Sequence, residues 1–186
     1  SDHYIKNEEA FVQVLENAVK VAEEEDKLVT IGITPTFPCT GYGYIRFDKS
    51  ETNSAKKVVE FKEKPDLATA EKYVASGEYA WNSGMFVWKA STILRYFEKL
   101  LPDIYDKLMI IKETMGTSSE YEVIQAIYDT IPKISIDYGI MERADGVYML
   151  EGDFGWNDIG SFDALPALYT SDEKGNVVRG ESVLID

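Results

Sequence analysis

A continuous apolar run at residues 28–33 follows directly on a segment with helical periodicity at residues 7–25. In the first segment apolar side chains recur every three or four positions, and Asn7 can cap its N-terminus. The second segment is rich in β-branched residues, which is typical of a strand buried in a parallel sheet. This succession therefore predicts an α/β fold.

The same alternation of strand and helix patterns continues along the chain, without an internal repeat. We expect further strands at residues 44–47, 57–64, 80–89 (interrupted at 82–84) and 147–150, and further helices at 67–76, 91–101, 119–129, 137–143 and 161–169. Asp66 and Gly77 can cap the helix at 67–76, and Ser119 with Glu122 forms a capping-box pattern. Residues 34–43 and 151–160 read as loops. The whole predicts an α/β domain with a mixed sheet flanked by helices.

Charge and the supply of histidine and cysteine exclude several kinds of site. Lys plus Arg is 19 and Asp plus Glu is 33, a net charge of −14, whereas nucleic-acid and anionic-membrane binders normally carry a basic excess. One His and one Cys can form neither a usual zinc site nor an internal disulfide. Any metal site must use oxygen ligands, which favours Mg²⁺ or Ca²⁺. The chain has no apolar run of transmembrane length and no signal-peptide pattern, so the expected compartment is the cytoplasm.

Two glycine-containing loops follow predicted strands, and in open α/β sheets ligands bind beyond the carboxyl ends of strands. Gly41, Tyr42 and Gly43 precede the strand at 44–47, where glycines either let a flat or hydroxylated ligand approach the backbone or simply form a turn. Asp158 lies between glycines, where its carboxylate either reaches a hard cation or caps the following helix.

Polar side chains also occur at the end of one strand and inside another. Glu63 and Lys64 precede Pro65, and adjacent strand residues point to opposite faces, so these two can share a pocket only if the strand bends there. A carboxylate suits sugar hydroxyls and an ammonium suits a phosphate, although a solvated charged strand end is the alternative. Asn82 interrupts an apolar strand, either as a ligand contact or as an internal hydrogen-bond anchor.

Several short segments occur together in an order that characterises one family. They are SDHYI at 1–5, GITPT at 32–36, TGYGYI at 40–45, FKEKP at 61–65, WNSGMF at 81–86, SIDYGIME at 135–142 and GWNDIGSF at 155–162. With them the chain resembles the mannose-1-phosphate guanylyltransferases, which are sugar-nucleotide pyrophosphorylases. This resemblance covers essentially the whole chain, and it implies a Rossmann-like nucleotidyltransferase sheet.

The resemblance implies catalytic and metal-binding roles for charged residues. Asp2 and Asp158 match the family's two metal-binding aspartates and would bind one Mg²⁺ at the carboxyl edge of the sheet. Lys64 would approach the phosphate of the sugar phosphate.

The resemblance also implies a sugar-binding site. Its residues would be the loop of Gly41, Tyr42 and Gly43, the hydroxyl-binding Glu63 and Asn82, and Asp137 nearby, together with Lys64.

The implied reaction is transfer of GMP from GTP to mannose 1-phosphate, giving GDP-mannose and pyrophosphate. An oxygen of the sugar phosphate would attack the α-phosphorus in line, and because this oxygen is already anionic the reaction needs no histidine base. Two alternatives remain open: another sugar-1-phosphate nucleotidyltransferase, and a non-enzymatic sugar-phosphate-binding subunit. The oligomeric state also remains open, a homo-oligomer included.

The family's Gly-rich segment, which holds the nucleotide, lies ahead of the position of Asp2. We therefore expect residues 1–180 to be the C-terminal part of a nucleotidyltransferase domain that is incomplete at its N-terminus, and residues 181–186 to begin a truncated downstream segment. We expect this piece alone to be inactive. Without the preceding strands, the strand at 28–33 should leave an exposed apolar edge.

Overall fold

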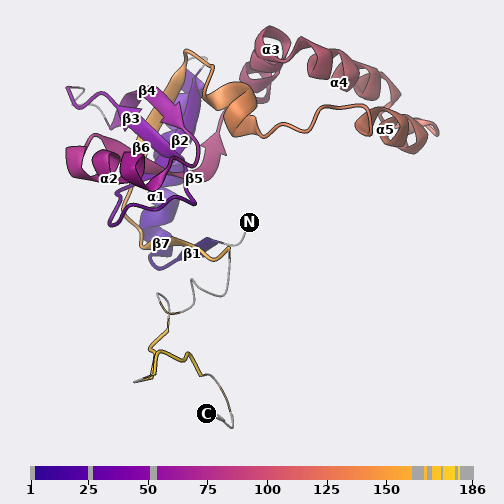
Figure 1. Ribbon diagram of the computed structural model, residues 1–186. Coiled ribbons are helices and arrows are strands. Elements are labelled where there is room, and N and C mark those ends of the chain that lie inside the picture. The colour runs from indigo at the N-terminus through magenta and orange to yellow at the C-terminus, as the bar shows by residue number, and fades with distance from the viewer. Residues whose placement is uncertain are drawn as a thin grey trace. The chain divides into compact units, whose positions relative to one another are not determined.

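The computed structural model describes residues 3–24, 27–50, 54–160, 166, 169–172, 174–178 and 180 (Figure 1). By its internal contacts the chain divides into two compact units, Val12–Gly152 and Ser1–Phe11 with Asp153–Asp186. The boundary expected after residue 180 stays a prediction, because residues 181–186 lie outside the described part, as does most of the helix expected at 161–169. In the ranges given above, no helix combines the length and the apolar character needed to cross a membrane.

Strands form the core of the Val12–Gly152 unit. In the described part they are β2 (Leu28–Ile33), β3 (Tyr44–Phe47), β4 (Ala55–Lys62), β5 (Tyr79–Val87) and β6 (Val147–Gly152), in the order β2-β5-β3-β4-β6. β6 pairs parallel with β2 and antiparallel with β4, so the sheet closes on itself. The mixed α/β architecture is confirmed.

The expectation of an exposed edge at β2 is wrong. This strand has a hydrogen-bonded neighbour on each side, β5 and β6, and every one of its residues is buried. Closure of the sheet supplies the partner that the sequence analysis assigned to missing strands.

Helices accompany the sheet: α1 (Glu8–Glu24), α2 (Leu67–Ser76), α3 (Ala90–Leu100), α4 (Pro102–Thr114), α5 (Glu120–Tyr128) and the π-helix η1 (Asp137–Met141). α1 buries Ala18 and Ala22 against Val29 of β2 and Leu150 of β6. α2 begins and ends where the sequence predicts, because Asp66 accepts a hydrogen bond from the Thr69 backbone N–H at 2.8 Å and Gly77 closes the helix at φ 60°.

Two helix ends differ from expectation. Pro102 follows one helix but also begins α4, a helix that the sequence analysis did not expect, and a proline in the first turn has no N–H that needs a partner. The predicted capping box is absent in this part of the structure, because Ser119 makes no side-chain cap bond at the start of α5. Instead, the carboxylate of Glu120 accepts a hydrogen bond from the Gly116 backbone N–H at 2.6 Å.

Gly32 of β2 occupies a position without room for a side chain. A Cβ atom there would overlap Met149 Sδ and lie 2.9 Å from Ala80 Cβ. We expect Gly32→Ala to lower the free energy of unfolding by about 1–3 kcal/mol, measured by urea titration. Gly41→Ala is the control, because its Cβ would meet only Cys39 Sγ at 3.7 Å. Equal stability losses in the two variants would contradict the packing at Gly32.

The other unit contains a short antiparallel pair, β1 (His3–Ile5) and β7 (Trp156–Asp158), with His3 opposite Asp158. The backbone N–H groups of Lys6 and Asn7 donate to the Phe154 carbonyl at 3.1 and 3.0 Å. Residues 151–160 are therefore not a loop throughout, as the sequence suggested. β7 is too short to produce a recognisable alternation of apolar and polar residues.

Candidate active site

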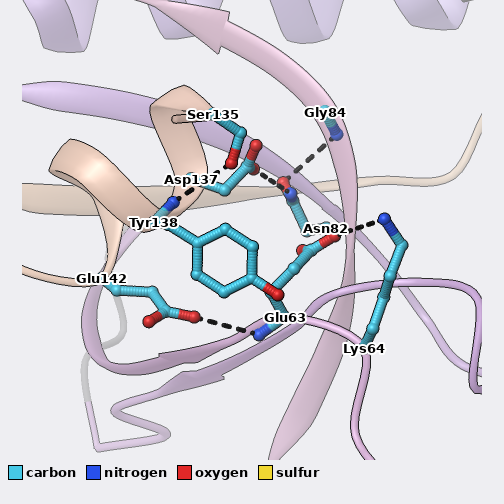
Figure 2. A network of polar contacts seen from close by, with 8 residues as sticks. All are labelled: Glu63, Lys64, Asn82, Gly84, Ser135, Asp137, Tyr138 and Glu142. Atoms are coloured by element: carbon cyan, nitrogen blue, oxygen red, sulfur yellow. Dashed lines mark hydrogen bonds and ion pairs between the residues drawn. The ribbon is translucent and has the colours of Figure 1, made fainter. Parts of the chain in front are cut away.

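Glu63, Lys64, Asn82 and Asp137 lie together in the Val12–Gly152 unit and are called the polar cluster below (Figure 2). Asn82 Nδ2 donates to Asp137 Oδ1 at 3.0 Å, and Lys64 Nζ pairs with Glu63 Oε1 at 3.1 Å. The members come from the end of β4, the middle of β5 and the start of η1. The structure thus brings together four residues that the sequence analysis had assigned to a sugar-phosphate site.

The chain bends where the sequence analysis required a bend. β4 ends at Lys62, and Lys64 adopts φ 45°, a left-handed conformation that residues with a side chain rarely adopt. This turn lets the side chains of Glu63 and Lys64 meet instead of pointing to opposite faces. The backbone N–H of Glu63 donates to Glu142 Oε1 at 3.2 Å, which ties the bend to the end of η1.

Glu63 has a buried carboxylate oxygen that packs against Gly43 and lacks a hydrogen-bond partner in the described residues. The Glu63 side chain is 11% exposed, and its Oε2 is buried without a hydrogen-bond partner in the described part of the chain. A Cβ atom on Gly43 would overlap Oε2 and lie 3.2 Å from Asn82 Cβ. Leaving a buried carboxylate oxygen unpaired is costly, so this position suits a hydroxyl or N–H donor of a ligand.

Asn82 serves as an internal hydrogen-bond anchor, which confirms one of the two alternatives from the sequence, and its role as a ligand contact stays a prediction. Its Oδ1 accepts hydrogen bonds from the Thr30 hydroxyl and the Gly84 backbone N–H, each at 3.2 Å. β5 runs through this segment without the predicted interruption. Instead, the pairing of β5 with β2 shifts its register between Thr30 and Gly32 of β2.

The π-helix η1 carries Asp137 to the polar cluster. A Cβ atom on Gly139 would come within 2.9 Å of Leu101 Cδ1, so glycine allows η1 to pack closely there. The Ser135 hydroxyl, just ahead of η1, accepts a hydrogen bond from the Tyr138 backbone N–H at 3.4 Å. Short π-helical turns occur frequently at functional sites.

Charge in the polar cluster and its neighbour Glu142 is divided between carboxylates and one ammonium. The hydrogen bond to Glu63 raises the pKa of Lys64, so this lysine remains charged at neutral pH. Its side chain is 60% exposed and can therefore reach a ligand. Carboxylates accept hydrogen bonds from sugar hydroxyls, and an ammonium group pairs with a phosphate. The combination therefore suits a sugar phosphate.

The loop that the resemblance assigned to the sugar site, residues 41–43, lies directly before β3. The Tyr42 ring contacts the Trp81 ring edge-on, with ring centroids 5.2 Å apart, and Trp81 is the neighbour of Asn82. Phe37 contacts the same Trp81 ring at 5.0 Å. Gly41 is exposed in this loop.

The predicted metal ligands are placed only in part. Asp158 ends β7 in the unit outside Val12–Gly152, and Asp2 lies outside the described residues, so their pairing stays a prediction. Within the described ranges, no group of three or more His, Cys, Asp or Glu side chains is arranged to hold a metal ion. The chemistry of Asp158 fits Mg²⁺, because it offers a hard carboxylate at a strand end.

The sequence analysis missed Thr30 and Glu142, which both contact the polar cluster. Thr30 is the hydroxyl-bearing residue in an otherwise apolar strand, and this contrast could have signalled it. Glu142 gave no usable signal, because its contact with Glu63 joins residues 79 positions apart.

Comparison with known proteins places this chain in one family. The nucleotidyl transferase family model matches residues 1–175. The chain is 41% identical over 190 residues to the mannose-1-phosphate guanylyltransferase of Salmonella montevideo, covering 97% of this chain. It is 39% identical over 188 residues to the mannose-1-phosphate guanylyltransferase of Escherichia coli K12, covering 98% of this chain. The chain spans 40% and 39% of the lengths of these two relatives.

Solved structures agree with the sequence comparisons. The chain superposes on the crystal structure described as mannose-1-phosphate geranyltransferase from Thermus thermophilus with a TM-score of 0.82 and 38% identity, covering 97% of this chain and 51% of that one. A structure described as mannose-6-phosphate isomerase from Helicobacter pylori gives a TM-score of 0.70 and 29% identity, covering 85% and 61%. These matches confirm the resemblance found in the sequence, and the chain belongs to the nucleotidyl transferase family.

Proposed function

We propose that this chain forms the sugar-phosphate-binding part of an enzyme that transfers GMP from GTP to mannose 1-phosphate. The products are GDP-mannose and pyrophosphate. The observation that carries the proposal is the polar cluster, in which a buried Glu63 oxygen without a partner in the described residues lies against Gly43. The similarity to two proteins named mannose-1-phosphate guanylyltransferase over nearly the whole chain supports the same reaction.

Each member of the polar cluster has a role in this reaction. Glu63 Oε2 and Asp137 accept hydrogen bonds from mannose hydroxyls, and Asn82 donates through its second N–H. Lys64 pairs with the phosphate of mannose 1-phosphate. These contacts hold the sugar phosphate so that one of its oxygens points at the α-phosphorus of GTP.

The chemistry then needs positioning more than proton transfer. The anionic phosphate oxygen forms a bond to the α-phosphorus, and the bond from that phosphorus to the bridging oxygen of the β-phosphate breaks, releasing pyrophosphate. Holding nucleophile and electrophile in line supplies much of the rate. Asp158, with Asp2, would hold Mg²⁺, which when bound stabilises negative charge on the transferring group.

Calorimetric titration of the chain with mannose 1-phosphate, and with GDP-mannose in the presence and absence of Mg²⁺, tests the binding part. We expect Gly43→Ala to weaken mannose 1-phosphate binding by about tenfold or more, because its Cβ displaces the Glu63 carboxylate. Ser118→Ala is the control, because Ser118 is an exposed residue between α4 and α5, outside the polar cluster. Unchanged affinity in Gly43→Ala would remove Glu63 from the sugar site.

The full-length gene product tests the reaction by release of pyrophosphate from GTP and mannose 1-phosphate. Transfer to another sugar 1-phosphate in preference to mannose 1-phosphate would overturn the choice of sugar. Binding of the sugar phosphate without transfer to any partner nucleotide would favour a non-enzymatic subunit instead.

A further inference from the structure

We propose that Thr30 is a positioning residue whose buried hydroxyl fixes the Asn82 amide with its N–H groups facing the sugar site. Thr30 lies in β2 and touches the polar cluster only through Asn82 among the hydrogen bonds of the described residues. The inference rests on the proposed function for the identity of the ligand, and on the hydrogen bonds around Asn82 for the mechanism.

The orientation of the Asn82 amide follows from the chemistry of its neighbours. The Gly84 backbone N–H can only donate, so the atom that it contacts at 3.2 Å must be Oδ1. The Asp137 carboxylate can only accept when ionised, so the atom that faces it at 3.0 Å must be Nδ2. The Thr30 hydroxyl can do either, and at 3.2 Å from Oδ1 it must donate.

The position of Thr30 explains why a polar residue is kept inside an apolar strand. Its exposed fraction is 1%, and burial of a hydroxyl is costly unless it forms a hydrogen bond. The register between β2 and β5 shifts between Thr30 and Gly32, so the backbone ladder is irregular at this point. At this point side-chain hydrogen bonds join the two strands: the Thr30 hydroxyl donates to Asn82, and the Ser83 hydroxyl donates to the Ile31 carbonyl at 2.7 Å.

This arrangement determines what Asn82 can offer to a ligand. Two donors occupy Oδ1, and one N–H is directed to Asp137. The remaining N–H suits an acceptor, such as a sugar hydroxyl oxygen, beside the acceptor Oε2 of Glu63. Without the Thr30 bond, Oδ1 keeps only the Gly84 N–H as a donor, so the amide is held less rigidly and its free N–H is less well aimed at a ligand.

Thr30→Val and Thr30→Ser separate the hydroxyl from the shape of the side chain. Valine keeps the branched shape and removes the donor, whereas serine keeps the donor. In NMR spectra of the ¹⁵N-labelled chain, the two side-chain amide proton signals of Asn82 are identified as those that disappear in the Asn82→Ala variant. We expect Thr30→Val to move these two proton signals toward those of exposed asparagines and to speed their exchange with water about fivefold or more. Thr30→Ser should leave them near their original positions. Unchanged Asn82 signals in a folded Thr30→Val protein would overturn the proposal.

The kinetic part uses the full-length gene product. We expect Thr30→Val to raise the KM for mannose 1-phosphate about tenfold, with kcat and the KM for GTP within about twofold, and Thr30→Ser to restore the lower KM. A merely structural loss would reduce the active fraction, and hence kcat, without changing KM. An equal rise of KM in the serine variant, or an unchanged KM beside shifted Asn82 signals, would overturn the role at the sugar site. Absence of GMP transfer by the unchanged protein would instead refute the proposed function, and the NMR comparison would still decide whether Thr30 orients Asn82.

Discussion

Asp158→Asn is expected to lower GMP transfer by the full-length gene product by on the order of 10²-fold or more. The substitution keeps the size of the side chain and removes the negative charge with which Asp158, at the end of β7, would hold Mg²⁺. Steady-state rates of pyrophosphate release at increasing Mg²⁺ concentration measure the effect. Direct titration with Mn²⁺, followed by electron paramagnetic resonance, provides a second readout that does not depend on turnover.

Asp153→Asn is the matched control for this experiment. Asp153 is exposed and lies in the same segment of the chain, so the control makes the same chemical change five positions away from Asp158. Its rate should stay within about twofold of the unchanged protein, as is usual for surface substitutions. A near-normal rate for Asp158→Asn at saturating Mg²⁺ would contradict the metal-binding role of Asp158.

The parts of the fold that the sequence predicted well depend on local signals. The six residues of β2 form one uninterrupted buried run, and α2 is bounded by a capping aspartate and a left-handed glycine. Strand closure could not be predicted in this way, because pairing of β4 with β6 joins segments distant in the sequence. The sequence likewise did not show that β6 pairs with β2, and this pairing is why β2 has no exposed edge.

The polar cluster was only partly predictable. The types of its residues pointed to a sugar phosphate, and Pro65 indicated where a bend could bring Glu63 and Lys64 together. The left-handed conformation of Lys64 and the contact of Glu142 with the bend depend on η1, whose π-helical turn has no clear sequence pattern. The sequence therefore predicted which residues meet better than it predicted what holds them there.

Glu63→Gln is expected to raise the KM for mannose 1-phosphate by roughly 10- to 100-fold and to leave the KM for GTP nearly unchanged. Glutamine has almost the same shape, but it replaces one acceptor oxygen with an NH₂ donor and removes the charge. Glu63 Oε2 has no protein partner in the described residues, so the loss of this acceptor falls on the ligand, whereas the loss of charge also weakens the pairing of Oε1 with Lys64. Initial rates with each substrate varied in turn give both constants.

Glu60→Gln is the control for this substitution, since Glu60 lies three positions earlier in β4 and pairs with Arg46 and Tyr79 instead of the polar cluster. Its effect on either KM should be about twofold or less. Glu63→Gln also weakens the hydrogen bond that raises the pKa of Lys64, but a lysine with an ordinary pKa still carries its charge at neutral pH. A KM increase confined to mannose 1-phosphate therefore reports the missing hydroxyl acceptor and not a discharged lysine. Equal increases for both substrates would show that Glu63 holds the bend at the end of β4 and does not contact the sugar.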